Sequence, residues 1–198
     1  MEKFHSSSAR SMPGRVFTQL LEVAQDQHGY VTPRDARALN INPLRLQDLV
    51  RQGLAEHVAH GVYRIVLVPM TALDQYMEAS LWPQVARGVL CAETALDLHE
   101  LCDVNPAKIH MTVPTGYRPR RDVPKLYTLH YCDLDDQDVT RHEGIPIVTP
   151  YRAILDGIGS HLGSRLLGQA IDNAKARGLL TREQLADVRR RQKAPDPA

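Results

Sequence analysis

Two breaks in a helical pattern near the start of the chain constrain its fold more than any other feature. Apolar residues recur with a helical period from Val16, and Gly29 ends that first helix. Thr32 and Pro33 then supply a capping hydroxyl and a proline at the first helical position. A short second helix therefore begins at this point, and the pattern predicts that it ends near Leu39.

The residues beyond this second helix complete the pattern. Residues 40–43 (Asn-Ile-Asn-Pro) predict a tight turn, and a third helix is expected from Pro43 to Gly53. The next residues, 54–66, indicate two short strands joined at His60-Gly61. This is the element order of a winged helix-turn-helix, which lays its third helix in a major groove and its hairpin, the wing, against the neighbouring backbone. We therefore predict such a DNA-binding domain over residues 1–68.

The period of the third helix separates a core face from a face that can contact DNA. Leu46 and Leu49 point towards the first two helices, at about 100° per residue. The opposite face carries the predicted DNA-binding residues Arg45, Asp48, Arg51 and Gln52. Arg45 lies in the first turn, where an arginine can grip guanine through two hydrogen bonds. Asp48 either accepts from a cytosine amino group or balances the charges of its two arginine neighbours.

Contacts to the DNA backbone are expected from the wing and from the start of the second helix. Arg64, His60 and His57 are wing candidates, and Thr32 with nearby backbone amides is a predicted phosphate anchor. The alternative for the arginines is an ordinary solvated face. Residues 1–68 carry a net charge of +2 and residues 69–198 one of −1. So weak a basic bias predicts modest, salt-sensitive binding by one copy, and hence a monomer that binds repeats cooperatively or a weak dimer.

Composition is that of a soluble globular protein. Of the 198 residues, 43% are hydrophobic and 24% are charged. The chain has no run of 18 apolar residues and no apolar signal core at its start, so we expect a cytoplasmic protein without a membrane partner. Cys91, Cys102 and Cys132 lack metal-ligand spacing, which predicts reduced and mostly buried thiols and no bound metal.

The remainder, residues 69–198, is predicted to be a second domain of the α+β class, with a small mixed sheet and a helical block. Pro69 and Pro83 bracket a short helix at the junction. Period-two patterns predict strands over 108–113, 126–131 and 144–149, the last an edge strand because Pro146 cannot donate to a ladder. Helical patterns occur over 92–101, 151–158, 166–177 and 181–191.

Polar residues of this second half do not match a known catalytic scheme. Asp133, Asp135, Asp136 and Asp138 fall in a turn, where aspartate is common for backbone reasons. His110 and His130 are expected to be cross-strand neighbours and not metal ligands, and the serines at 6–8 a disordered lead-in. We therefore expect no enzymatic activity and no cofactor. A loop with Arg118, Arg120 and Arg121 is either a surface for a protein partner or an ordinary solvated loop.

Several segments together resemble one protein family. In the N-terminal part these are His28-Gly-Tyr-Val-Thr, Val50-Arg-Gln-Gly-Leu-Ala and His60-Gly-Val-Tyr-Arg-Ile. Further along they are Leu90-Cys-Ala-Glu-Thr-Ala-Leu-Asp-Leu-His, Ile109-His-Met-Thr-Val-Pro and the stretch from Gly144 to Asp156. From about Val16 to Leu185 the chain resembles the AbiEi antitoxins of type IV toxin–antitoxin systems, also called abortive-infection systems.

The resemblance implies two activities. The winged helix would bind double-stranded DNA at repeats in its own promoter and repress the operon, and the larger domain would counter a nucleotidyltransferase-like toxin, directly or indirectly. The acidic Asp48 in the third helix leaves the operator sequence open. One alternative is a ligand-sensing winged-helix regulator, which would need a deep apolar pocket with a few convergent polar groups. Another is a nuclease or nucleotidyl-modifying enzyme, which would need carboxylates lining a cleft.

Overall fold

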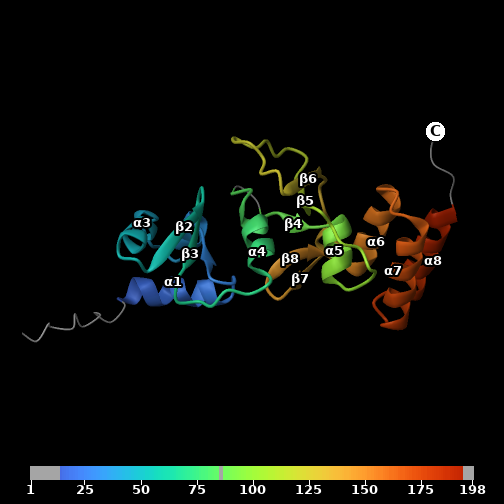
Figure 1. The fold of residues 1–198 in the computed structure, drawn as a ribbon, viewed down its shortest axis with the longest axis horizontal. Coiled ribbons are helices and arrows are strands. Elements are labelled where there is room, and N and C mark those ends of the chain that lie inside the picture. Colours follow the sequence, from blue (N-terminus) through green and yellow to red (C-terminus); the bar gives the residue numbers. More distant parts are fainter. Residues whose placement is uncertain (1–13, 85–86, 194–198) are drawn as a thin grey trace, which may run out of the picture.

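The computed structural model describes residues 14–84 and 87–193. Its helices and two small sheets form an α+β fold, as predicted. Figure 1 shows three parts in a row: a helical unit with a small sheet at one end, a larger sheet in the middle, and a helical block at the other end. The serine lead-in at 6–8 lies outside the described residues. No described helix has the length and apolarity needed to cross a membrane.

The N-terminal unit has the element order predicted for a winged helix-turn-helix. Its elements are α1 (Arg15–Gln25), β1 (Tyr30–Val31), α2 (Pro33–Ala38), α3 (Leu44–Arg51), β2 (Ala55–Ala59) and β3 (Val62–Ile65). The three strands form an antiparallel sheet in the order β1-β3-β2, so β2 and β3 make the wing. Strand β1 was not predicted, because two residues are too few to show an alternating pattern.

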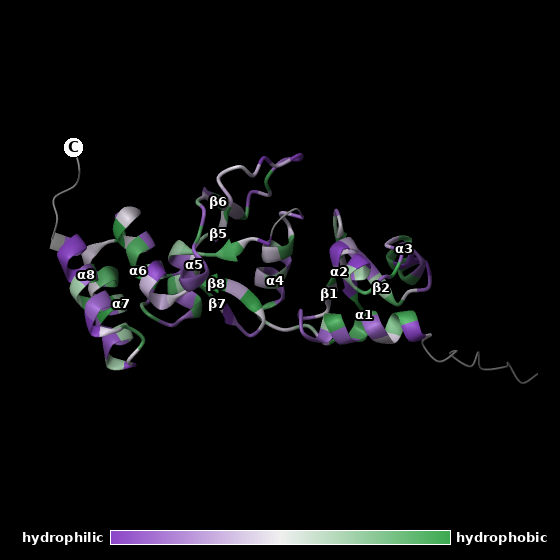
Figure 2. Cartoon of the chain, turned by 180° about the vertical axis from the view of Figure 1, so that it is seen from behind, coloured by the Kyte–Doolittle hydropathy of each residue, from purple (hydrophilic) through white to green (hydrophobic). Residues whose placement is uncertain are grey.

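Local chemistry explains where these helices begin. The hydroxyl of Thr32 accepts a hydrogen bond from the backbone of Asp35, whose carboxylate accepts one from the backbone of Thr32 at 2.8 Å. This reciprocal capping box starts α2 at Pro33. In α1, hydrophobic and hydrophilic residues alternate along the ribbon in Figure 2, as expected of a helix that buries one face. Phe17 and Leu20 lie on that face, in the core of the unit.

The C-terminal part contains the predicted mixed sheet and helical block. Its strands are β4 (Val89–Leu90), β5 (Ile109–Val113), β6 (Tyr127–Tyr131), β7 (Val139–His142) and β8 (Ile145–Val148), in the order β6-β5-β4-β8-β7. Pairs β5–β6 and β4–β8 are parallel, and the other two are antiparallel. The helices are α4 (Asp74–Leu81), α5 (Ala92–Leu98), α6 (Pro150–Gly159), α7 (Ser164–Ala176) and α8 (Arg182–Lys193), with the short 3-10 helix η1 (Asp136–Asp138) before β7.

The prediction that residues 144–149 form an edge strand was wrong. Strand β8 lies between β4 and β7, and β7 covers the side that was expected to be free. Pro146 is tolerated because it pairs with Arg141, the second pair from the hairpin turn. In a two-residue hairpin the first pair, here His142 and Ile145, exchanges the hydrogen bonds and the second does not. The turn itself, Glu143-Gly144, has positive φ at both residues.

The described residues form two hydrophobic cores, which meet at the junction of the two units. One lies between α1, α3 and the wing, and the other between the five-stranded sheet and the surrounding helices. Tyr30 and Val62 belong to the N-terminal unit by sequence, yet they pack in the second core. The two units therefore share a buried contact and are not joined by the connector alone.

Candidate nucleic-acid interface

The exposed face of α3 carries the residues that the sequence predicted for it. The side chains of Arg45 and Arg51 are 63% and 76% exposed, respectively. Leu46 and Leu49 are buried against the rest of the unit, as the helical period requires. Gln52 follows the helix as its C-cap and is exposed. Arg45 and Arg51 are thus both exposed on the face of α3 opposite its core residues, where the sequence predicted DNA contacts.

Asp48 sits between the two arginines and binds both. Its carboxylate accepts a hydrogen bond from Arg45 at 3.2 Å and a shorter one from Arg51. The hydrogen bond from Arg51 is the main cause that lowers the pKa of Asp48, so this carboxylate is ionised near neutral pH. The sequence left two roles open for Asp48: accepting a hydrogen bond from cytosine or balancing the charges of the two arginines. In the free protein its geometry matches the second role. Exposed ion pairs of this kind are weak, so either arginine can leave Asp48 at small cost.

The wing does not project freely into solvent. The carbonyl oxygen of His60, at its tip, accepts hydrogen bonds from Gln84 Nε2 at 2.6 Å and from Arg121 Nη1 at 3.1 Å. Both donors belong to the C-terminal part of the chain. The His60 side chain remains exposed, and that of His57, also exposed, contacts the Tyr63 ring with centroids 4.8 Å apart. The wing tip is thus held against the second unit by its backbone.

Arg64 is buried, which contradicts the prediction that it contacts DNA. Its residue is 7% exposed, and its Nε lies 3.5 Å from a carboxylate oxygen of Asp74 in α4. A second nitrogen donates to the carbonyl of Val68 at 2.6 Å. The sequence placed Arg64 on a two-stranded wing with one solvated face. Helix α4 brings Asp74 against this side chain, and no local sequence pattern shows that packing.

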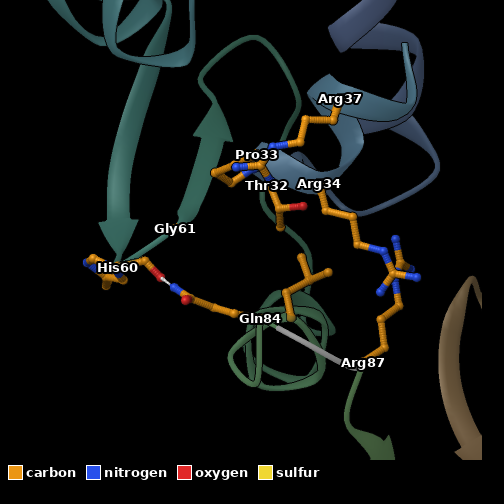
Figure 3. Close-up of a pocket in the computed structure, with 9 residues that line it drawn as sticks. Thr32, Pro33, Arg34, Arg37, His60, Gly61, Gln84 and Arg87 are labelled. Carbon is orange, nitrogen blue, oxygen red and sulfur yellow. Dashed lines mark hydrogen bonds between the residues drawn. The ribbon is translucent and has the colours of Figure 1, made fainter. Parts of the chain in front are cut away.

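Thr32 also differs from its predicted use as a phosphate anchor. Its hydroxyl donates to Asp35 at 2.7 Å and is therefore committed to the capping box. Thr32 nevertheless borders a cavity of about 260 Å³ between α2, the wing tip and the end of α4. Figure 3 shows Arg34 and Arg87 reaching towards each other along one side of this cavity. Sequence reasoning missed both arginines: they are 53 positions apart, so only the fold brings them together.

The basic loop is only partly available to a partner. Arg121 lies over the ring of Trp82 at 4.7 Å and donates to the Trp82 carbonyl at 2.7 Å. The Arg121 guanidinium is therefore already bound within the chain, and less of it is available to a partner than the prediction assumed. Arg118 donates to two carbonyls of its own loop, and Arg120 is exposed.

The acidic and histidine residues of the second unit have structural contacts. Asp133 accepts hydrogen bonds from the backbone and hydroxyl of Thr115, and Asp138 pairs with Arg152 at 3.4 Å. The rings of His110 and His130 stack on the sheet with nitrogens 3.1 Å apart, as expected of cross-strand neighbours. Among the described residues, no group of three or more His, Cys, Asp or Glu side chains is placed to hold a metal ion.

The N-terminal unit matches one known protein family. Residues 19–66 match the family described as "Transcriptional regulator, AbiEi antitoxin". This match confirms the AbiEi resemblance over these residues. The matched residues run from α1 to the end of β3, and so include the arginine face of α3 and the wing. The AbiEi family is one of transcriptional regulators that act as antitoxins.

One solved structure is similar over most of the chain. The crystal structure of the RV2827C protein from Mycobacterium tuberculosis is similar at 15% sequence identity with a TM-score of 0.49. That similarity covers 91% of this chain and 73% of the other. No curated protein matches the sequence.

Proposed function

We propose that this protein is a DNA-binding antitoxin that represses its own operon and counters a toxin. The observation that carries the proposal is the exposed arginine face of α3 within the AbiEi-matched segment. Arg45 and Arg51 are the residues that read DNA, and Gln52 extends the same surface. His60, exposed at the wing tip, is a secondary contact to the backbone, whereas buried Arg64 makes none.

The DNA target in this proposal is a set of repeats in the protein's own promoter. The two arginines of α3 share one carboxylate, so a single copy offers little net positive charge to the groove. Phosphate neutralisation sets most of the affinity of such proteins and its dependence on salt. Weak single-site binding thus favours repeated sites, filled either by monomers bound cooperatively or by a weak dimer.

The second unit is proposed to supply the antitoxin activity against a nucleotidyltransferase-like toxin. We place the boundary of the two domains near residue 68, because every residue of the first core lies at or before that position. The units are less separable than their sequences suggest. A cut after residue 68 would leave Arg64 without its partner Asp74 and would expose Tyr30 to solvent. Substitutions in the full chain therefore separate the two activities more cleanly than fragments do.

The ligand-sensing alternative has less support in the second unit. A cavity of about 780 Å³ lies against β6 and α6, but charged and polar side chains such as Arg152, Asp156 and His130 line it. Such a lining differs from the deep apolar pocket expected of a sensor domain.

A promoter fusion in cells tests the DNA-binding half of the proposal. The wild-type chain should repress a reporter driven by its own promoter, and the double variant R45A/R51A should relieve repression. R189A, which removes an exposed arginine of α8, is the matched control and should repress normally. Equal repression by all three proteins would contradict a role for α3.

Co-expression with the adjacent toxin tests the antitoxin half. Cells that carry the toxin should be rescued by R45A/R51A as well as by the wild type, because the proposed antitoxin surface lies elsewhere. Rescue that disappears together with repression would show that the chain acts through DNA alone and would contradict a separate antitoxin domain.

A further inference from the structure

The cavity at the wing tip differs from the α3 surface in position and in chemistry. It lies where α2, the β2–β3 turn and the residues after α4 meet, so both units contribute to it (Figure 3). Its lining comprises Thr32, Pro33, Arg34, Arg37, His60, Gly61, Leu81, Gln84 and Arg87. Three of these residues carry guanidinium groups, and no acidic residue is among them. A concave surface that carries three guanidinium groups is suited to an anion.

Arg34 and Arg87 form the centre of that charge. Arg34 extends from α2 in the first unit, Arg87 precedes β4 in the second, and their guanidinium groups lie next to each other in Figure 3. Arg87 is 27% exposed and pairs with Asp35 at 3.5 Å. It also donates to the side-chain oxygen of Gln27, so Gln27 and Asp35 fix its position from behind.

The positive charge at this position is only partly balanced. Burial lowers the pKa of Arg87, and the neighbouring charges of Arg141 and Arg34 lower it further, against the opposing effect of Asp35. Within the described part of the chain, Asp35 pairs with Arg87 alone, so the two adjacent guanidinium groups repel each other. An anion placed between them removes that repulsion and receives charge-assisted hydrogen bonds from both.

We infer that this cavity binds a phosphate or diphosphate group, held by Arg34 and Arg87 from the two units. Guanidinium forks match the oxygens of a phosphate in pairs, which a lysine cannot do. A volume of about 260 Å³ falls just below the usual range for whole small-molecule ligands, about 300–1,000 Å³, and so suits a phosphoryl group better than a complete nucleotide. Gly61 keeps the mouth open beside Gln84, because it has no side chain there.

Occupancy of the site has a structural consequence. A ligand gripped by Arg34 and Arg87 adds to the contacts from Gln84 and Arg121 to the wing tip, all of which join the two units. The bound group therefore stabilises the arrangement in which the wing lies against the second unit. The phosphate belongs either to the DNA backbone or to a free phosphorylated metabolite. The two arginines would bind the phosphate oxygens in the same way in both cases.

Isothermal titration of the full chain with inorganic pyrophosphate tests the inference. One saturable site should appear, and R34Q should weaken it by roughly tenfold, the loss expected from one charge-assisted contact. R34Q removes an exposed side chain, so folding should be unaffected, whereas R87Q should weaken binding at least as much but also disturbs Asp35. R189Q in α8 is the charge-matched control and should bind pyrophosphate like the wild type.

Competition then identifies the source of the phosphate. If a short duplex displaces pyrophosphate, the natural ligand is a DNA phosphate, and if both bind together, it is a free phosphorylated molecule. Absence of saturable binding, or equal weakening by R34Q and R189Q, would overturn the inference. The titration contains no DNA, so its failure leaves the proposed role of α3 intact, and a failure of α3 to bind DNA leaves this site intact.

Discussion

Arg64 and Asp74 form a buried ion pair across the connector between the two units. Their side chains are 8% and 6% exposed, and the closest approach is 3.5 Å. Asp74 also accepts hydrogen bonds from the backbone and hydroxyl of Thr71, both at 2.7 Å. Arg64 Nε and the second oxygen of Asp74 make no hydrogen bond within the described residues. Arg64 thus holds α4 against the wing sheet and is not available to DNA.

Asp74→Asn should destabilise the protein by about 3 kcal/mol, because it leaves the Arg64 charge buried without a partner. The amide oxygen of the asparagine can still accept the hydrogen bonds from Thr71, so the loss of stability reports mainly on the ion pair. Urea unfolding of the wild type, D74N and the double variant R64M/D74L measures it. The double variant should recover much of the loss, since an apolar pair removes both charges. Equal destabilisation in both variants would argue against an uncompensated charge as the cause.

Asp48→Asn should strengthen binding to duplexes of any sequence, because it frees Arg45 and Arg51 from their shared carboxylate. The slope of log affinity against log salt should steepen by about one to two ions. Fluorescence anisotropy over a series of salt concentrations measures both quantities. Weaker binding confined to the promoter repeat would show instead that Asp48 reads a cytosine.

Gly61→Ala should loosen the wing tip from the second unit. Gly61 has a φ of +71°, and an added Cβ would lie 2.5 Å from Gln84 Nε2, the donor to His60. The expected loss of stability is about 1–2 kcal/mol, from backbone strain together with the displaced hydrogen bond. Gly116→Ala is a matched control in an exposed loop, where a Cβ meets nothing within 4 Å. Equal unfolding midpoints for the two variants would contradict the docked wing.

Stability should fall as the pH drops below about 6.5, the ordinary pKa of histidine. Burial lowers the pKa of His99, whose ring lies 2.8 Å from the carbonyl of Val148. The unfolded chain therefore binds more protons than the folded one, so this contribution is complete above pH 6.5 and is lost below it. His99→Gln retains a donor for Val148 and should show a shallower decline in urea midpoint between pH 7.5 and 5. An unchanged decline would exclude His99 as its source.

Much of this fold follows from local sequence signals. The capping box at Thr32, the period of α3 and the wing turn at Gly61 each depend on neighbouring residues, and the structure contains all three. The burial of Arg64 depends on Asp74 of α4, which meets it across the connector in a contact visible only in three dimensions. The internal position of β8 depends likewise on β7, which the sequence showed only as an acidic turn and a short polar stretch.

One candidate site likewise follows from local sequence, and the other depends on contacts between distant residues. The arginine face of α3 is a property of one helix, so its period alone predicts which side chains are exposed. The cavity between Arg34 and Arg87 has no such signal, because its two halves come from different units. The contacts of Arg121 had no sequence signal either, because the aromatic ring under its guanidinium lies 39 positions away.

The affinity of the chain for a duplex that carries one promoter repeat tests the central claim most directly. Gel-shift titrations of the wild type, R45A and the control R189A at one fixed salt concentration give the comparison. We predict that R45A loses about 1–3 kcal/mol of binding free energy and part of its sequence preference, while R189A binds like the wild type. Unchanged affinity and unchanged preference in R45A would contradict DNA reading by α3.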